Sequence, residues 1–404
     1  MINYLKIYNG TVLTPQRTIP GGCVIIADGV IAEVSDQQID VPGAIEIDAR
    51  GQYIAPGFID MHVHGGGGHD FMDNTIEAFH QIAITHARFG TTAMMPTTLS
   101  CGKQDLLDTL AIYEQADKGN DKGAAFVGLH IEGPYFSMQQ RGAQDPRYIR
   151  NPDPAEYMEI LSRSPAIKRW SAAPELPGAP EFGRYLTSRN ILAALAHTDA
   201  IYEEVVKGYE AGFTHATHFY SCMSGVSRRN AYRYAGVIES AYLIDGMTVE
   251  IIADGVHLPA PLLKLVYKIK GPEHTALITD AMRAAAMPEG LSVLGSLKDG
   301  LNVLVEDGVA KLPDRSAFAG SVATADRLVL NMVELAAIPL RDAVRMMSET
   351  PASILRIQDR KGTLEKGKDA DVVIFDDKIN IHTTIVNGKI VYTSKEISPG
   401  ILSK

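Results

Sequence analysis

The middle of the chain alternates strand-like and helix-like segments, and this alternation restricts the fold more than any other feature of the sequence. Helical patterns cover residues 76–89, 105–113, 200–210 and 260–269. Eight apolar, β-branched segments are typical of strands: 54–64, 91–97, 124–132, 169–173, 191–197, 213–218, 248–254 and 275–280. This order predicts an α/β protein whose main part is a (β/α)8 TIM-like barrel. An open doubly wound sheet is the alternative, because alternation alone does not separate the two.

Both ends of the chain are strand-like and contain hairpin turns. Asp28-Gly29 and Asn387-Gly388 each lie between apolar segments, which is a strong hairpin pattern. Neither end alone has enough strands to be stable in water. We therefore predict that both ends form one small β-sandwich domain, from residues 1–54 and 357–404, beside a catalytic barrel at 55–356.

Composition narrows the class of protein. The 404 residues are 46% hydrophobic and 21% charged, with a formal net charge of −10, which is typical of a globular protein. The acidic balance argues against nucleic acid or an anionic membrane as partner. There is no signal-like N-terminus and no apolar run near the roughly 18 residues of a membrane span. Cys23, Cys101 and Cys222 form no CxxC pair and indicate free thiols, so we expect a cytoplasmic protein.

Polar residues end five of the predicted strands: His62-Val63-His64, Glu132, His197, His218 and Asp280. In a barrel of this type the active site lies at the carboxyl ends of the strands. Side chains alternate along a strand, so both imidazoles of His-Val-His point the same way. Imidazole and carboxylate groups bind divalent metals. The pattern therefore predicts a metal centre.

Each of these residues also has an ordinary structural interpretation. A lone histidine in a strand is usually a core or surface residue, and an aspartate after a strand often caps a helix. Metal-binding residue types at the ends of five separate strands are improbable by chance, and this favours a metal centre. The remaining histidines without such placement are interpreted as structural: His69, His80, His86, His215 and His274.

Two motifs point to a known family. The segment Pro56–Gly68 resembles the first-strand signature of the amidohydrolase superfamily, and Gly128–Pro134 resembles the N-acetylglucosamine-6-phosphate deacetylases, in which a glutamate at this point binds the metal. The resemblance runs from about residue 10 to 393. Further matching segments follow in order: Ala173-Pro174-Glu175, Ala216-Thr217-His218, Ile252–His257, Thr279-Asp280-Ala281 and, at superfamily level, Gly362–Asp371.

The resemblance implies roles for the strand-end residues. Glu132, His197 and His218 fall on the principal metal site, His62 and His64 on a second site, and Asp280 on the catalytic acid/base. It implies one or two divalent ions, zinc before iron, nickel, cobalt or manganese. It also implies hydrolysis of N-acetylglucosamine 6-phosphate to glucosamine 6-phosphate and acetate, by a homodimer in which a partner's loop helps to bind the phosphate.

The positions that the resemblance assigns to substrate contact depart from the family pattern more than the predicted metal ligands do. Positions that the resemblance assigns to substrate contact are Ala143, Gln144, Ser221, Cys222, Arg229, His257, Phe318, Ala319, Gly320 and Ser321. Arg228, Arg229 and Arg233 follow a ligand strand and suit a phosphate. The sequence departs from the family at Ser221-Cys222, which replace Asn-Ala, at Gln144, which replaces a histidine, and in a longer arginine loop. These departures leave the exact sugar open.

Three alternatives follow. N-acetylgalactosamine 6-phosphate or a related acylamino sugar would need the same chemistry. A dihydroorotase-like or aminoacylase-like enzyme usually has a carboxylated lysine between two metals, and no lysine ends a matching strand here. An inactive paralogue that binds a sugar phosphate is disfavoured by the complete set of ligands with Asp280.

Overall fold

A ring of parallel strands forms the centre of the computed structural model, which describes residues 3–394. Its strands are β6 (Phe58–Val63), β9 (Thr91–Pro96), β11 (Leu129–Glu132), β12 (Ile167–Ala172), β13 (Leu192–Leu195), β14 (Phe213–Ala216), β17 (Thr248–Ile251) and β18 (Thr275–Leu277). β6 pairs with β9, and β11 through β18 pair in sequence order. Parallel bridges between Thr97 and His130 and between Val63 and Ala281 join the two runs. The pairing therefore returns to β6, and the predicted α/β class is confirmed.

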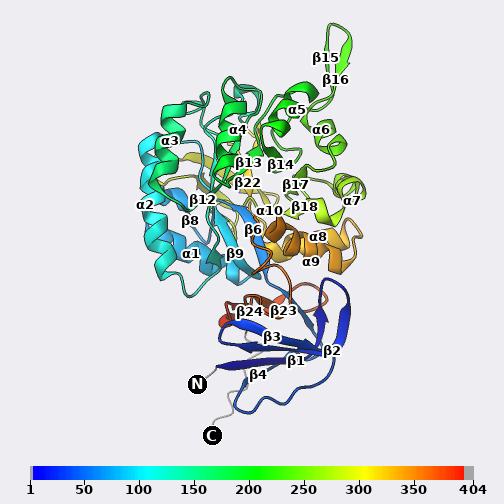
Figure 1. Cartoon of the computed structure of the whole chain (residues 1–404). Coiled ribbons are helices and arrows are strands. Elements are labelled where there is room, and N and C mark those ends of the chain that lie inside the picture. The colour runs from blue at the N-terminus through cyan, green and yellow to red at the C-terminus, as the bar shows by residue number, and fades with distance from the viewer. Residues whose placement is uncertain (1–2, 395–404) are drawn as a thin grey trace.

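Helices cover the outside of this ring (Figure 1). Those with bounds close to the predicted ones are α1 (Ile76–Ala87), α2 (Lys103–Gly119), α5 (Tyr202–Glu210) and α7 (Ala260–His274). The sequence patterns missed α3 (Pro154–Arg163), α4 (Ala179–Ser188), α6 (Val237–Leu243), α8 (Ala325–Glu334), α9 (Leu340–Met346) and α10 (Glu349–Ile354). These are short, and the helices α3 and α4 carry a proline in their first turn, where its missing N–H costs nothing.

Two predicted strands are each divided. The predicted 54–64 segment becomes β5 (Tyr53–Pro56) and β6, and the 124–132 segment becomes β10 (Ala125–Phe126) and β11. Gly57 lies between the first pair, and a side chain is not tolerated there because a Cβ would lie 2.1 Å from Thr92 Oγ1. β5 leaves the ring and pairs with β1 and β23.

Strands from both chain ends form one eight-stranded sheet in the order β25-β24-β23-β5-β1-β2-β3, with β4 beside β1. Their bounds are β1 (Tyr4–Leu13), β2 (Thr18–Ala27), β3 (Val30–Ser35), β4 (Ile45–Asp48), β23 (Val372–Phe375), β24 (Ile381–Val386) and β25 (Lys389–Thr393). A bridge between Val30, in the edge strand β3, and Asp369, just before β23, curls the sheet over a core that includes Ile7, Val24 and Ile374. The strands of both chain ends thus form a single curled sheet. Residues 1–2 and 395–404 of the predicted domain lie outside the described residues.

A small antiparallel sheet that the sequence did not predict follows β18. It contains β19 (Gly290–Leu294), β20 (Leu301–Glu306), β21 (Val309–Lys311) and β22 (Phe318–Ser321). A bridge from Ala281 to Ser321 attaches it to the carboxyl end of the ring. Its core contains Met282, Leu294 and Val303.

Shorter elements complete the carboxyl end of the ring. They are β7 (Gly65–Gly66), β8 (His69–Asp70), η1 (Phe71–Asp73), η2 (Met138–Gln140) and the hairpin of β15 (Ser227–Arg229) and β16 (Tyr232–Tyr234). The hairpin projects from the body of the molecule (Figure 1). Within residues 3–394, no helix combines the length and apolar character that crossing a membrane requires.

Candidate active site

A cavity of about 240 Å³ opens at the carboxyl end of the parallel strands. Five of the six strand-end residues of the predicted metal centre contribute to its wall: His64, Glu132, His197, His218 and Asp280. His62 lies beneath them and is fully buried. The structure therefore brings together side chains that are more than two hundred positions apart in the sequence.

The ring nitrogens of four histidines converge on Glu132. His218 Nε2 lies 3.0 Å from Glu132 Oε1 and 3.2 Å from His197 Nε2. His62 Nε2 lies 3.2 Å from His64 Nε2 and 3.5 Å from Glu132 Oε1. These atoms form two groups, His62 with His64 and Glu132, and Glu132 with His197 and His218, whose ligand atoms all lie within 4.8 Å of one another. Two Nε2 atoms facing each other need a proton or a metal between them, and this donor set fits a divalent cation.

In three of the four rings the opposite nitrogen has a partner that determines the direction of the ring, whereas Nδ1 of His218 is buried with no hydrogen-bond partner in the described part of the chain. His64 Nδ1 lies 3.2 Å from Thr97 O, and His197 Nδ1 lies 2.8 Å from Gln140 O. His62 Nδ1 lies 2.9 Å from a carboxylate oxygen of Glu250. A donor N–H on Nδ1 leaves the lone pair of Nε2 for the cavity, which is the usual arrangement of metal-binding histidines.

His197, His218 and Asp280 each follow the last residues of a strand and have positive φ angles of 46°, 30° and 47°. The left-handed region is uncommon for residues other than glycine and concentrates at functional sites. The strands end before these residues, so the turn in the backbone directs each side chain across the mouth of the ring.

The carboxylate of Asp280 lies beside the histidines and faces two of them. Its Oδ1 is 3.2 Å from His64 Nε2 and 3.5 Å from His62 Nε2. Burial opposes its charge, but His62 and His64 together hold the pKa of Asp280 below its ordinary value. In the described chain the next helix after Asp280 is α8 at Ala325, so the helix-cap interpretation is excluded. A buried carboxylate that is ionised at neutral pH can accept a proton.

Glu132 is held on its second oxygen by Gln144. Gln144 Nε2 donates to Glu132 Oε2 at 2.7 Å, and Gln144 Oε1 accepts from Ser100 N at 2.8 Å. Ser100 N–H can only donate, which determines the orientation of the amide. Burial would raise the pKa of Glu132, but the charge of His62 and hydrogen bonds from His197 and His218 hold it well below its usual range.

Residues 53–391 match the model of the amidohydrolase family. The chain belongs to the amidohydrolase family.

The relatives of this chain align with nearly its whole length. It is 34% identical to N-acetylglucosamine-6-phosphate deacetylase of Lysinibacillus sphaericus, over 91% of this chain and 92% of the relative. It is 32% identical to N-acetylgalactosamine-6-phosphate deacetylase of Escherichia coli O157:H7, over 94% and 97%. Among solved structures, a mutant N-acetyl-D-glucosamine-6-phosphate deacetylase from Mycobacterium smegmatis in complex with N-acetyl-D-glucosamine-6-phosphate matches with a TM-score of 0.89 at 28% identity, over 97% of this chain and 100% of that one.

Most of the predicted substrate contacts of this amidohydrolase line the same cavity. They are Ala143, Gln144, Ser221, Cys222, His257, Phe318 and Gly320. His257 is oriented by a residue that the sequence analysis did not single out: its Nδ1 lies 2.7 Å from Asp254 Oδ2. Its ring packs against that of Phe318, with centroids 4.8 Å apart.

Three predicted contacts lie elsewhere. Ala319 is buried in the core of the small sheet, because its side chain points to the face of β22 opposite to that of Phe318, which lines the cavity. Ser321 is also buried, and its hydroxyl donates to Thr279 O at 2.7 Å, so its role is to join β22 to the strand end. The backbone of Arg229 belongs to β15 in the projecting hairpin (Figure 1); its side chain lies outside the described part of the chain.

The histidines interpreted as structural lie outside the cavity wall. His80 contacts Ala116 O at 2.8 Å and His86 contacts Gly65 O at 2.9 Å. His69 belongs to β8, and His274 ends α7. His215 is different because it touches Glu250 below the site, at 3.1 Å.

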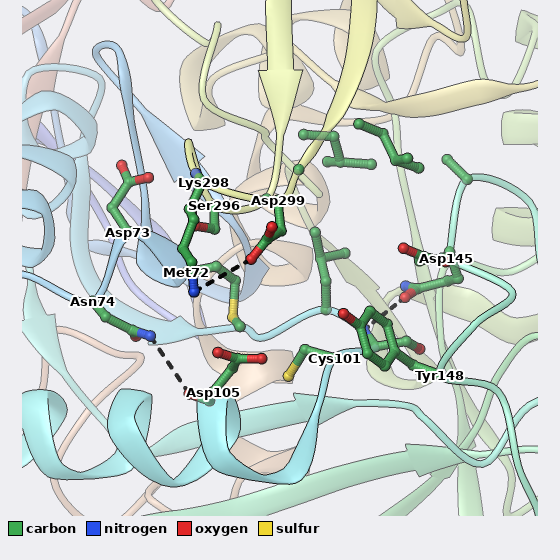
Figure 2. A pocket seen from close by; sticks show the side chains of 18 of the residues that line it. Met72, Asp73, Asn74, Cys101, Asp105, Asp145, Tyr148, Ser296, Lys298 and Asp299 are labelled. Carbon is green, nitrogen blue, oxygen red and sulfur yellow. Dashed lines mark hydrogen bonds and ion pairs between the residues drawn. The ribbon is translucent and has the colours of Figure 1, made fainter.

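A second cavity of about 300 Å³ adjoins the first and shares Leu99, Ala143, Gln144 and Leu294 with it. Figure 2 shows that carboxylates from several separate segments surround it. Its charged residues are Asp73, Asp105, Asp108, Asp145 and Asp299 against Lys298 alone. Arg283, Arg147 and Lys298 pair with Asp73, Asp145 and Asp299. The remaining carboxylates, Asp105 and Asp108, make this cavity less favourable to an anionic group.

Proposed function

We propose that this amidohydrolase removes the acetyl group of N-acetyl-D-glucosamine 6-phosphate, releasing D-glucosamine 6-phosphate and acetate in amino-sugar catabolism. One observation carries the proposal: Glu132 and the Nε2 atoms of four histidines meet beside the carboxylate of Asp280 at one cavity. Relatives that cover nearly the whole chain are named for this reaction.

Glu132, His197 and His218 would hold one divalent ion, with His62 and His64 beside Glu132 for a second. Zinc is the first choice for this nitrogen-rich donor set, and iron, nickel, cobalt and manganese are the alternatives. Such an ion supplies a lowered pKa for water and polarises the acetyl carbonyl.

Asp280 would act as the acid/base. Its carboxylate takes one proton from the attacking water as the new C–O bond forms, and it returns that proton to the sugar nitrogen as the C–N bond breaks. The immediate products are acetic acid and a neutral amine, with Asp280 ionised again. The acid then loses its proton to the amine or to solvent, which leaves acetate. Oriented by Asp254, His257 donates from Nε2 to a substrate oxygen when protonated there.

The substrate phosphate would lie away from the second, acidic cavity. We assign it to the side of the first cavity that Ser221 and Cys222 line, from which the chain continues to the arginine-bearing hairpin. A homodimer would let a partner's hairpin reach this side.

The same proposal treats the ring as a (β/α)8 barrel within residues 55–356, the curled terminal sheet as a separate small domain, and the protein as cytoplasmic.

The test is acetate release from purified, zinc-loaded protein, with the metal content measured on the same sample. We expect at least one equivalent of metal per chain and turnover of N-acetylglucosamine 6-phosphate. A preparation that binds this sugar phosphate and retains its metal, yet releases no acetate from any acetylamino sugar phosphate, is an inactive binding paralogue.

N-acetylgalactosamine 6-phosphate is the second candidate substrate. It is favoured by the E. coli relative at 32% identity and by Gln144, Ser221 and Cys222, which line the cavity where the sequence departs from the deacetylase pattern. A side-by-side comparison of kcat/KM on the two epimers decides between them, because the two sugars differ only at one hydroxyl.

A further inference from the structure

Below the predicted metal ligands, a buried carboxylate accepts hydrogen bonds from several strands. Glu250 Oε1 lies 2.9 Å from His62 Nδ1, and Glu250 Oε2 lies 3.1 Å from His215 Nε2. The backbone N–H of His218 donates to Oε1 at 3.3 Å. Glu250 is fully buried, so its charge depends entirely on these partners and on one arginine.

Arg169 neutralises that charge. It donates to both oxygens of Glu250, from Nη1 and Nη2, at 2.6 Å each. It also donates to Met61 O at 3.1 Å and to Thr217 Oγ1 at 2.8 Å. Met61 and Thr217 each directly precede a predicted ligand, His62 and His218. The pair therefore braces the strand ends that carry two ligands.

An ionised carboxylate can only accept hydrogen bonds, so the ring proton of a neutral His62 must lie on Nδ1. Its Nε2 lone pair then faces His64 Nε2 at 3.2 Å and Glu132 Oε1 at 3.5 Å. The Nδ1 atoms of His64 and His197 face backbone carbonyls instead. Among these three histidines, His62 alone is oriented by a carboxylate, which also makes a ring nitrogen more basic.

We propose that Glu250, held by Arg169, is the positioning residue for His62 and sets the metal affinity of the group formed by His62, His64 and Glu132. This inference rests on the proposed metal centre but not on the identity of the sugar. Glu250 does not line the cavity. Among the described ligand side chains it contacts the imidazole of His62, and it reaches His218 only through the backbone N–H, so we expect its effect to pass mainly through the His62 ring.

A double-mutant cycle on metal binding tests the proposal. We expect Glu250→Gln to weaken zinc binding by about 10- to 100-fold, measured by competition with a chromophoric chelator on the full chain. In a His62→Gln background the same change should alter zinc affinity by less than about threefold, because the mediating ring is gone. Equal weakening in both backgrounds, or none in either, overturns the proposal.

Thr248→Val is the matched control. Thr248 Oγ1 lies 2.8 Å from His215 Nδ1, so this change disturbs the same buried network without touching His62. Zinc affinity should stay within about threefold of the unaltered chain. A loss as large as that of Glu250→Gln would mean that any damage to the network suffices, and would also overturn the proposal.

A measurement on the unaltered protein covers the case in which Glu250→Gln does not fold. In zinc-loaded protein with ¹⁵N-labelled histidine, the His62 ring proton should be on Nδ1 and slow to exchange. A proton on Nε2 overturns the proposal. Metal affinity and ring proton are both read without substrate, so an enzyme that hydrolyses a different amide would refute the proposed function and leave this inference standing.

Discussion

Backbone geometry at single residues organises the cavity. His197, His218 and Asp280 have positive φ angles immediately after strands of small and apolar residues. Such conformations cost about 1–3 kcal/mol each, and they aim the three side chains at Glu132 and His64. The strain is maintained by the parallel strands on either side, whose hydrogen bonds continue to these positions, such as that from Asp280 N to His62 O at 2.9 Å.

Asp280→Asn should lower kcat at least about 100-fold, because an amide cannot take the proton of water and return it to the leaving nitrogen. The change keeps the size of the side chain, so the metal content and KM should vary by less than about threefold. Steady-state kinetics on N-acetylglucosamine 6-phosphate and metal analysis check this together. Near-normal turnover would remove Asp280 from its assigned role.

Gln144→Leu should also weaken metal binding, because Glu132 Oε2 loses the donor at 2.7 Å and the remaining buried carboxylate oxygen is free to rotate. We expect a loss in zinc affinity of about tenfold or more. Gln144→Glu should weaken zinc binding further, since a second carboxylate would then face Glu132. Should Gln144→Leu bind zinc as tightly as the unaltered chain, the amide serves only the substrate side.

These residues differ in how far the sequence could reveal them. Glu132, His197, His218 and Asp280 were predictable because they end apolar segments, and the ends of parallel strands meet in space. The orienting role of Gln144 could not be predicted, because it depends on the path of a loop whose sequence has no periodic pattern. Arg169 and Glu250 do leave a signal, charges inside apolar strands, but only the closed ring shows that the two charges face each other.

At the scale of elements, the loops above the ring are joined by one buried ion pair. Arg283, after β18, contacts both oxygens of Asp73 at the end of η1, at 2.8 and 2.6 Å. Asp73 also accepts from Leu297 N at 3.2 Å. The pair therefore ties η1 to the small sheet that forms part of the cavity wall.

Stability should depend on pH through Asp73. Burial opposes its charge, but hydrogen bonds and the charge of Arg283 hold the pKa of Asp73 below its ordinary value of 3.8. A depressed folded-state pKa stabilises the native state above pH 4 and loses that contribution as pH falls through the lowered value. Asp73→Asn should cost about 2 kcal/mol of unfolding free energy at pH 7, and this difference should shrink below pH 4.

Urea unfolding of Asp73→Asn and the unaltered chain at pH 7, 5 and 3 measures that difference. Lys298→Ala is a suitable control, because it changes an exposed charge in the same loop. A difference that stayed constant down to pH 3 would show that the pair acts by packing and not by charge.

The small sheet and the shorter helices mark where element prediction failed. Leu291 and Leu297 are 87% and 68% exposed, so this segment lacks the alternation that identifies a half-buried strand. α6 and α9 have only seven residues each, too few for a helical period to be recognised. The long apolar strands and helices with clear caps, such as α1 behind Thr75, were placed to within a few residues.

At the scale of the whole molecule, the proposed metal centre should contribute to global stability. Its proposed ligands come from four strands of the ring, β6, β11, β13 and β14, or from residues just after them. Removing the metal leaves several buried ionisable groups facing one another without a cation. Zinc at a thousand times its dissociation constant stabilises a folded chain by about 4 kcal/mol.

Chelation followed by calorimetry should therefore lower Tm by roughly 5 °C, and added zinc should restore it. Metal analysis must confirm that the chelated sample is empty. An unchanged Tm in a metal-free sample would mean that the ion is held too weakly to matter for folding.

The chain ends give the molecule a particular order of assembly. β5 pairs with β23, with Ile54 opposite Ile374, so this edge of the terminal sheet has no partner until nearly the entire chain has left the ribosome. At about 5–20 residues per second that interval is roughly 15–60 s. During synthesis the nascent N-terminal strands thus present an open edge, and chaperones that shield such edges should engage this polypeptide early.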